Sequence, residues 1–154
     1  MIEAAVSGDV NIAKVLVKCT TGSCNDGMGS KNSLIYAAAF GHVEVVRVLL
    51  EGGANVESTD DVNNNALHQA AWNGHLEVCR LLLNWGAKVD PLNMWQDTPL
   101  HVAARRGHLS VVKLLVERGA DVRVRNEDDQ TASDMARVYG ELDVAEWLDL
   151  GSRG

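Results

Sequence analysis

The chain has 154 residues, of which 46% are hydrophobic and 23% are charged, values that are ordinary for one globular domain with its own core. Its formal net charge of −7 argues against a nucleic-acid-binding protein, because such a protein needs a basic face for the phosphates. Its apolar runs are only a few residues long, which argues against membrane insertion, and its three cysteines are too few for a disulfide framework.

The N-terminal segment MIEAAVSGDV has no basic region ahead of an apolar stretch, so we expect no signal peptide. Together with cysteines expected to be reduced, this predicts an intracellular protein of the cytoplasm and/or the nucleus. The chain begins inside a predicted helix, and glycines then recur every 33 residues, at Gly8, Gly41, Gly74, Gly107 and Gly140. This period divides a single domain, 1–154, into units 1–31, 32–64, 65–97, 98–130 and 131–154, with the first and last as caps.

The first unit leads into the second through the stretch CTTGSCNDGMGSKN, Cys19 to Asn32. Three interpretations of this stretch are open: a linker, half of a metal site, or a loop of the repeat. The stretch is as long as the corresponding stretches of the later units, which favours the repeat loop. Ser23 stands in it where the later units have a valine, so we expect this loop to be the most mobile of the series.

The unit 98–130 shows how one repeat is built. In DTPLHVAARRGH, Thr98 suits the N-cap of a helix, Pro99 its first turn, and Gly107 the left-handed conformation that ends it. This predicts a helix of about two turns, kept thin by paired alanines, and the apolar run LSVVKLLVERG predicts a second, largely buried helix. Helices this short are not stable alone, so stability must come from stacking of neighbouring units.

The last unit, 131–154, departs from the others at two positions. Arg137 replaces the alanine of the internal units, and Asp149 replaces a leucine or valine. Those positions would pack against a following unit, so polar residues there predict a C-terminal cap that faces water.

These motifs resemble those of the ankyrin-repeat family. The segment TPLHVAARRGHLSVVKLLVERGADV is close to the signature of that family, and the resemblance covers essentially the whole chain. It implies an all-α solenoid of stacked antiparallel helix pairs, with β-hairpin-like finger loops. It also implies a non-catalytic protein–protein interaction module (an adaptor, an inhibitor or a recognition domain) that binds a protein or peptide through its concave surface and finger tips. The alternative is a self-associating structural or spacer domain.

The histidines and cysteines do not form a predicted ligand cluster. His42, His75 and His108 share one repeat position and His68 and His101 another, so each set would form a ladder along the stack, which in this family serves turns and hydrogen bonds between repeats. Cys79 takes the place of a core valine, and Cys19 and Cys24 lack the partners of a closed zinc site. We expect no enzyme activity, no cofactor and no metal.

The expected contact surface is formed by the finger tips and the exposed ends of the first helices. Aromatic residues gather there although the repeat does not require them, and tryptophan, tyrosine and arginine are typical of binding hot spots. The candidate partner-binding residues are Phe40, Val62, Trp72, Asn73, Met94, Trp95, Asp97, Arg105, Arg106 and Tyr139. Near Arg105 and Arg106 an acidic or phosphorylated segment of the partner is expected. Trp85 is left open, as a contact residue or as a cover for the far edge of the stack; Trp147 is expected in the core and Tyr36 at a half-buried position.

Overall fold

The structure is a computed structural model that describes residues 2–19 and 28–151. Within these ranges the chain forms ten helices and no strand: α1 (Ile2–Ser7), α2 (Val10–Cys19), α3 (Met28–Ala39), α4 (Val43–Glu51), α5 (Ala66–Trp72), α6 (Leu76–Asn84), α7 (Pro99–Arg105), α8 (Leu109–Glu117), α9 (Ala132–Val138) and α10 (Leu142–Gly151). None of these helices is long and apolar enough to cross a membrane.

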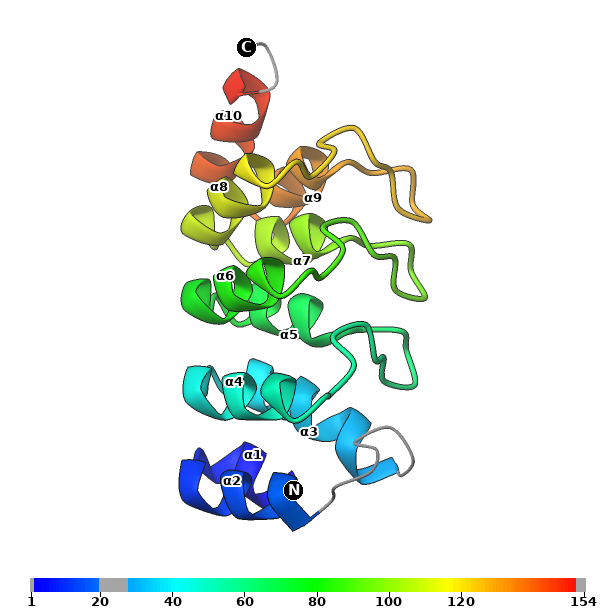
Figure 1. Cartoon of the computed structure of the whole chain (residues 1–154). Coiled ribbons are helices and arrows are strands. Elements are labelled where there is room, and N and C mark those ends of the chain that lie inside the picture. Colours follow the sequence, from blue (N-terminus) through cyan, green and yellow to red (C-terminus); the bar gives the residue numbers. More distant parts are fainter. Residues whose placement is uncertain (1, 20–27, 152–154) are drawn as a thin grey trace.

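The helices form two packed rows. The odd-numbered helices α3, α5, α7 and α9 contact one another in succession, and α4, α6 and α8 do the same in the second row (Figure 1). Three loops project from the stack to the same side (Figure 1); we call them the second finger (residues 52–65), the third finger (85–98) and the fourth finger (118–131). The predicted all-α solenoid of stacked helix pairs is confirmed. The hairpin character of the described fingers is slight, with one isolated bridge between Thr59 and Asn65.

The helix boundaries predicted for unit 98–130 are confirmed. The hydroxyl of Thr98 accepts a hydrogen bond from the N–H of His101, and Pro99 is the first residue of α7. Gly107 has φ 72°, in the left-handed region where a side chain is strained. The paired alanines of α3, α5 and α7 are wholly buried, which lets neighbouring first helices approach closely.

One expectation about the first loop is wrong. Residues 28–31 belong to the stretch Cys19 to Asn32 that was expected to be a loop of the repeat, but α3 begins at Met28 and includes them. Methionine and lysine favour helix, and no proline fixes the start of α3 as Pro99 fixes that of α7. The rest of that loop, with the expected mobility around Ser23, lies outside the described residues.

The histidines form the two expected ladders. Nε2 of His42, His75 and His108 lies 2.9–3.0 Å from a carbonyl oxygen of the preceding unit. Nε2 of His68 and His101 lies 3.0 and 3.1 Å from a carbonyl oxygen of the following finger. His42, His75 and His108 thus join neighbouring units, whereas His68 and His101 each join the first helix of a unit to the finger that ends the same unit. Cys79 is wholly buried in the core, as predicted, and burial raises the pKa of its thiol to about 12.

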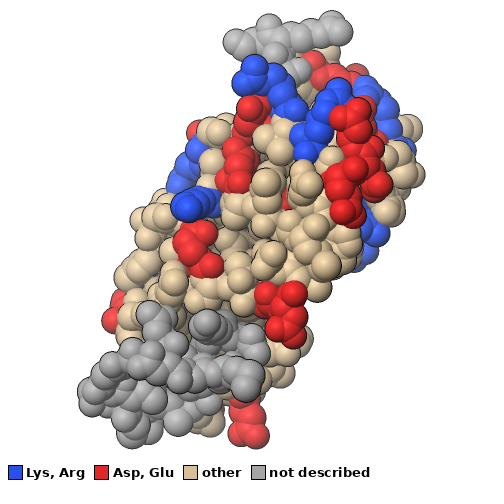
Figure 2. Space-filling model, turned by 90° about the vertical axis from the view of Figure 1, so that its right-hand side faces the viewer, with Lys and Arg blue, Asp and Glu red and all other residues tan. Residues whose placement is uncertain are grey.

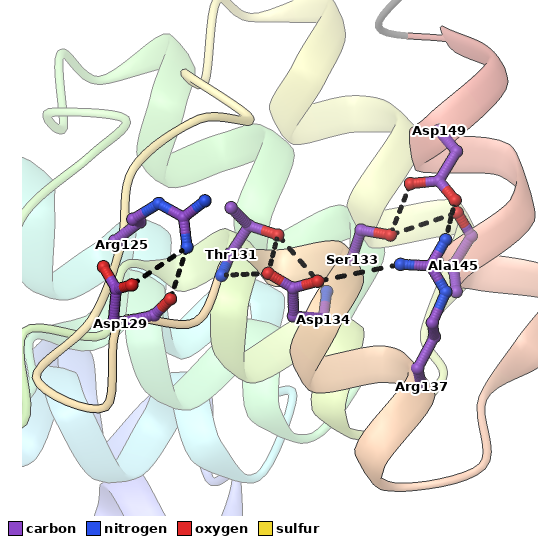
Figure 3. A network of polar contacts seen from close by, with 8 residues as sticks. All are labelled: Arg125, Asp129, Thr131, Ser133, Asp134, Arg137, Ala145 and Asp149. Carbon is purple, nitrogen blue, oxygen red and sulfur yellow. Dashed lines mark hydrogen bonds and ion pairs between the residues drawn. The ribbon is translucent and has the colours of Figure 1, made fainter.

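The last unit carries the expected polar cap, and its polar side chains bind one another. The guanidinium of Arg137 contacts the carboxylates of Asp134 and Asp149, and the hydroxyl of Ser133 donates to Asp149 over 2.6 Å (Figure 3). This network spans α9 and α10. Within it, Arg137 and Asp149, which replace apolar residues of the internal units, pair with each other. Trp147 is partly buried against the core, whereas Tyr36 is exposed rather than half-buried.

Candidate functional site

A cleft of about 370 Å³ lies where the third and fourth fingers meet the first helices of the last three units. Its lining comes from α5, α7 and α9 with their caps, and from the second, third and fourth fingers: Asn64, His68, Gln69, Trp72, Asn93, Trp95, Asp97, Val102, Arg105, Asn126, Glu127, Asp128, Gln130, Met135 and Tyr139. A concave site of this size that combines aromatic and polar side chains is typical of ligand and peptide binding.

On the helix side, two arginines lie against aromatic rings. The guanidinium carbon of Arg105 is 5.2 Å from the ring centre of Trp72 and 4.3 Å from that of Tyr139. The guanidinium carbon of Arg106 is 4.9 Å from the ring centre of Trp72. Trp72 and Arg105 occupy one repeat position, and Arg106 and Tyr139 the next, so stacking of α5, α7 and α9 brings the four together. Each such contact contributes about 0.5–1 kcal/mol at an exposed site.

On the finger side, the tips are joined through their backbones. The N–H of Met94 donates to the carbonyl of Val62 over 3.0 Å, and the N–H of Glu127 donates to the carbonyl of Trp95 over the same distance. The second, third and fourth fingers therefore lie side by side and present Trp95, Glu127 and Asp128 along one edge of the cleft.

The fingers are also joined by a ladder of asparagine side chains, which corrects one prediction. Asp97 was expected to contact a partner, but it is only 5% exposed. Its Oδ1 accepts from Nδ2 of Asn126 over 2.9 Å, as Oδ1 of Asn64 accepts from Nδ2 of Asn93 over 3.0 Å one finger earlier. Asp97 is thus a structural residue of the floor, where a polar side chain finds its partner in the next finger.

Two buried histidines lie under the fingers. His68 lines the cleft and His101 occupies the next unit. Burial lowers the pKa of both imidazoles, although their bonds to backbone carbonyls oppose the shift. A lowered pKa favours the neutral form of both rings, and each ring is hydrogen-bonded to the backbone of a finger. These bonds give the floor of the cleft a fixed shape.

The other predicted contact residues separate into three groups. Trp72, Trp95, Arg105 and Tyr139 line the cleft, and Arg106 adjoins it through Trp72. Val62 is half-buried and Met94 is 53% exposed, and both lie at finger tips. Neither of these two lines the cleft, and the same holds for Phe40 and Asn73, which are both exposed. Phe40 stacks on His42 at 6.1 Å between ring centres, and Asn73 donates from Nδ2 to the carbonyl of Gln69.

Trp85 lies away from the cleft. It caps the C-terminus of α6 in the second row of helices and is 43% exposed, as is Trp95. It is not a lining residue of the cleft.

Gln69, Glu127, Asp128 and Gln130 are not among the candidate residues, although all four line the cleft and the last three lie at a finger tip, where the contact surface was expected. Glu127, Asp128 and Gln130 occupy the finger tip that corresponds to Met94–Asp97, so the repeat register was a usable signal. Gln69 lies one helical turn before Asn73 and shares its repeat position with Val102. Polar residues of a binding site and ordinary solvated loop residues look alike in a sequence, because polar loops are common.

The side from which the fingers project has a distinct distribution of charge. Figure 2 shows acidic and basic side chains gathered toward one end of this face, next to a broad uncharged area. Among the described residues no group of three histidine, cysteine, aspartate or glutamate side chains is arranged to hold a metal ion.

Comparison with known protein families agrees with the geometry. A family model described as ankyrin repeats (3 copies) matches residues 1–93, and one described as ankyrin repeat matches residues 95–127. No curated protein matches the chain. The two matches cover α5, α7 and the second and third fingers, whereas α9, which also lines the cleft, lies beyond them. The chain therefore belongs to the ankyrin-repeat family.

Proposed function

We propose that the protein is a non-catalytic protein–protein interaction module that binds a protein or peptide through the cleft between its fingers and first helices. Adaptor, inhibitor and recognition domain are all compatible with this role. The observation that carries the proposal is the gathering of Trp72, Trp95, Tyr139, Arg105 and Arg106 at one concave site. Ankyrin repeats are generally protein-binding modules, and these residue types dominate binding energy at interfaces.

The partner segment would be acidic or phosphorylated where it meets Arg105 and Arg106. A planar guanidinium group binds carboxylate or phosphate with two parallel hydrogen bonds. Both arginines lie at the cleft, within reach of such a segment.

Paired tryptophan substitutions test the proposal. Proteins that co-purify with the wild type would be identified, and the binding of each purified candidate would then be measured against Trp95→Ala and Trp85→Ala. The two tryptophans are equally exposed, but only Trp95 lines the cleft. We expect Trp95→Ala, and likewise Trp72→Ala, to weaken binding by about 1–2 kcal/mol or more while Trp85→Ala leaves it unchanged. Equal losses from Trp95→Ala and Trp85→Ala would contradict the assignment of the cleft.

The alternative function, self-association as a spacer, is favoured by exposed apolar residues of the last unit. Val138, Leu142 and Leu150 are 62–66% exposed. Sedimentation at several concentrations separates the two functions: a partner-binding module stays monomeric without its partner, and a spacer associates with itself.

A further inference from the structure

We propose that the cleft selects a peptide segment that carries both signs of charge, with a carboxylate side chain bound by Arg105 and Arg106 and a basic side chain bound by Glu127 and Asp128. This inference rests on the proposed function and specifies the chemistry of the partner. The inference follows from which charged side chains, among the described residues, have an oppositely charged partner within the chain.

The arginines of the cleft lack carboxylate partners in a strongly acidic chain. Among the described residues, Arg47, Arg80, Arg123, Arg125 and Arg137 each have a carboxylate oxygen within 4.0 Å. Arg105, Arg106 and Arg118 have none, and of these three only Arg105 and Arg106 contact aromatic rings. The chain has 21 acidic residues and 14 basic ones, so two adjacent arginines without a carboxylate are unexpected. Their hydrogen-bonding capacity is available to a ligand.

The aromatic rings prepare these arginines for binding. A guanidinium whose face lies against a ring keeps its N–H groups at the edge, where they can donate to an acceptor. Because Trp72 and Tyr139 already restrict Arg105, less side-chain entropy is lost when a ligand binds. The site is therefore organised for a planar anion before the partner arrives.

The acidic residues of the same cleft favour a carboxylate over a phosphate. Asp97, Glu127 and Asp128 line the cleft together with Arg105. A phosphorylated side chain carries about −1.5 to −2 charges and is repelled by these carboxylates more strongly than a carboxylate with one charge. An unmodified aspartate or glutamate is the better match.

The finger side supplies the opposite charge. Glu127 and Asp128 are exposed at the tip of the fourth finger, and neither has a basic partner within 4.0 Å among the described residues, whereas the neighbouring Asp129 pairs with Arg125 (Figure 3). A basic side chain that lies across this edge would gain two unpaired carboxylates. In the bound segment, the basic residue would lie at the finger tips and the acidic residue at the helix ends. This order would fix the direction of the segment in the cleft.

The test uses random peptides displayed on phage and selected against the purified protein. The expected result is enrichment of peptides that contain both an acidic and a basic residue. The best peptide, made synthetically, should lose about tenfold or more in affinity to the variant Arg105→Glu/Arg106→Glu. The matched control is Arg118→Glu, since Arg118 is an exposed arginine at the end of α8, outside the cleft. Thermal unfolding of each variant would confirm that it is folded.

A second pair of measurements tests the two charges separately. Exchanging the acidic residue of the peptide for lysine should restore binding to Arg105→Glu/Arg106→Glu, and exchanging its basic residue for glutamate should restore binding to Glu127→Lys/Asp128→Lys. A phosphoserine in place of the acidic residue should not bind more tightly than the carboxylate.

The outcomes separate this inference from the proposed function. Peptides that depend on Trp95 but not on charge, peptides that bind more tightly when phosphorylated, or the absence of any enriched peptide would each overturn the inference and leave a protein-binding cleft in place. Binding that is insensitive to both Trp72→Ala and Trp95→Ala would overturn the proposed function itself.

Discussion

Asn65, the N-cap of α5, has a side-chain amide whose hydrogen-bonding groups do not match those of the neighbouring His68. Nε2 of His68 lies 3.0 Å from the carbonyl of Asp97 and must carry the proton, so Nδ1 is an acceptor. Nδ1 lies 2.9 Å from Oδ1 of Asn65, a second acceptor, while Nδ2 of Asn65 is buried without a partner. Rotating the side-chain amide by half a turn does not remove the mismatch. The donor Nδ2 would then face another donor, the backbone N–H of His68, which is 3.0 Å from Oδ1.

Asn65→Thr should therefore stabilise the protein. In the next unit the hydroxyl of Thr98 can donate to Nδ1 of His101 over 2.8 Å and accept from the N–H of His101. Removing the buried, unpaired amide should raise the free energy of unfolding by about 1–3 kcal/mol. The measurement is the midpoint of urea unfolding at an unchanged slope. Thr98→Asn is the matched control and should destabilise the protein; a gain in both variants would contradict the hydrogen-bond assignment.

The buried histidines predict a loss of stability in mild acid. Burial holds the pKa of His68 and His101 below the ordinary value of about 6.5 in the folded state. Below pH 6.5 the unfolded chain binds protons that the folded chain does not, so the free energy of unfolding falls as pH decreases toward the folded pKa. Urea unfolding at pH 7.5 and pH 5.5 would measure the loss, and His101→Gln should show a smaller dependence on pH. An equal dependence in both proteins would rule out His101 as a contributor.

At the scale of the element, side chains add to the backbone hydrogen bonds that hold the fingers. Oδ1 of Asn126 accepts from the N–H groups of Asp128 and Gln130 within the fourth finger, while Nδ2 donates to Asp97 of the third finger. One side chain thus closes the turn and joins it to its neighbour. The same arrangement recurs at Asn93.

Asn126→Ala should loosen the fourth finger and leave the helices intact. Loss of three hydrogen bonds from a buried side chain should speed amide exchange at residues 127–130 and cost about 1–3 kcal/mol of stability. Hydrogen exchange followed residue by residue would show this. The helical content by circular dichroism should not change, and protected amides at the finger tip of the variant would argue against this function of Asn126.

At the scale of the whole molecule, unit 131–154 differs from the internal units in the polarity of two positions. Arg137 stands where internal units bury alanine, and Asp149 stands where they have a buried or partly buried leucine or valine. The two side chains bind each other across α9 and α10 (Figure 3). Polar residues at this end oppose the addition of another unit.

The double variant Arg137→Ala/Asp149→Leu should associate with itself. It would restore the apolar character of an internal unit on a face that already carries exposed Leu142 and Leu150. Sedimentation velocity at increasing concentration should show a dimer for the variant and a monomer for the wild type. A variant that stays monomeric would mean that the polar pair does not limit association.

Much of the fold could be predicted because its determinants are local. Thr98, Pro99 and Gly107 fix the ends of α7 by their own backbone preferences, and the 33-residue period repeats that information along the chain. The prediction was wrong at residues 28–31, where no proline marks the helix start. It was also wrong at Asp97, because a polar residue that faces solvent and one that binds the next finger look alike in a sequence.

The sequence by itself determined the repeat length, the two helices of each unit, the buried alanines and the polar last unit, because each depends on residues that are close along the chain. Only the tertiary structure decided how side chains of different units meet. Arg105 lies between Trp72 and Tyr139, each about 33 residues away along the chain, because the stacking of α5, α7 and α9 places equivalent positions side by side. The physical reason is that contacts between units depend on the rise of the stack and on side-chain conformation, and neither is written in the local sequence.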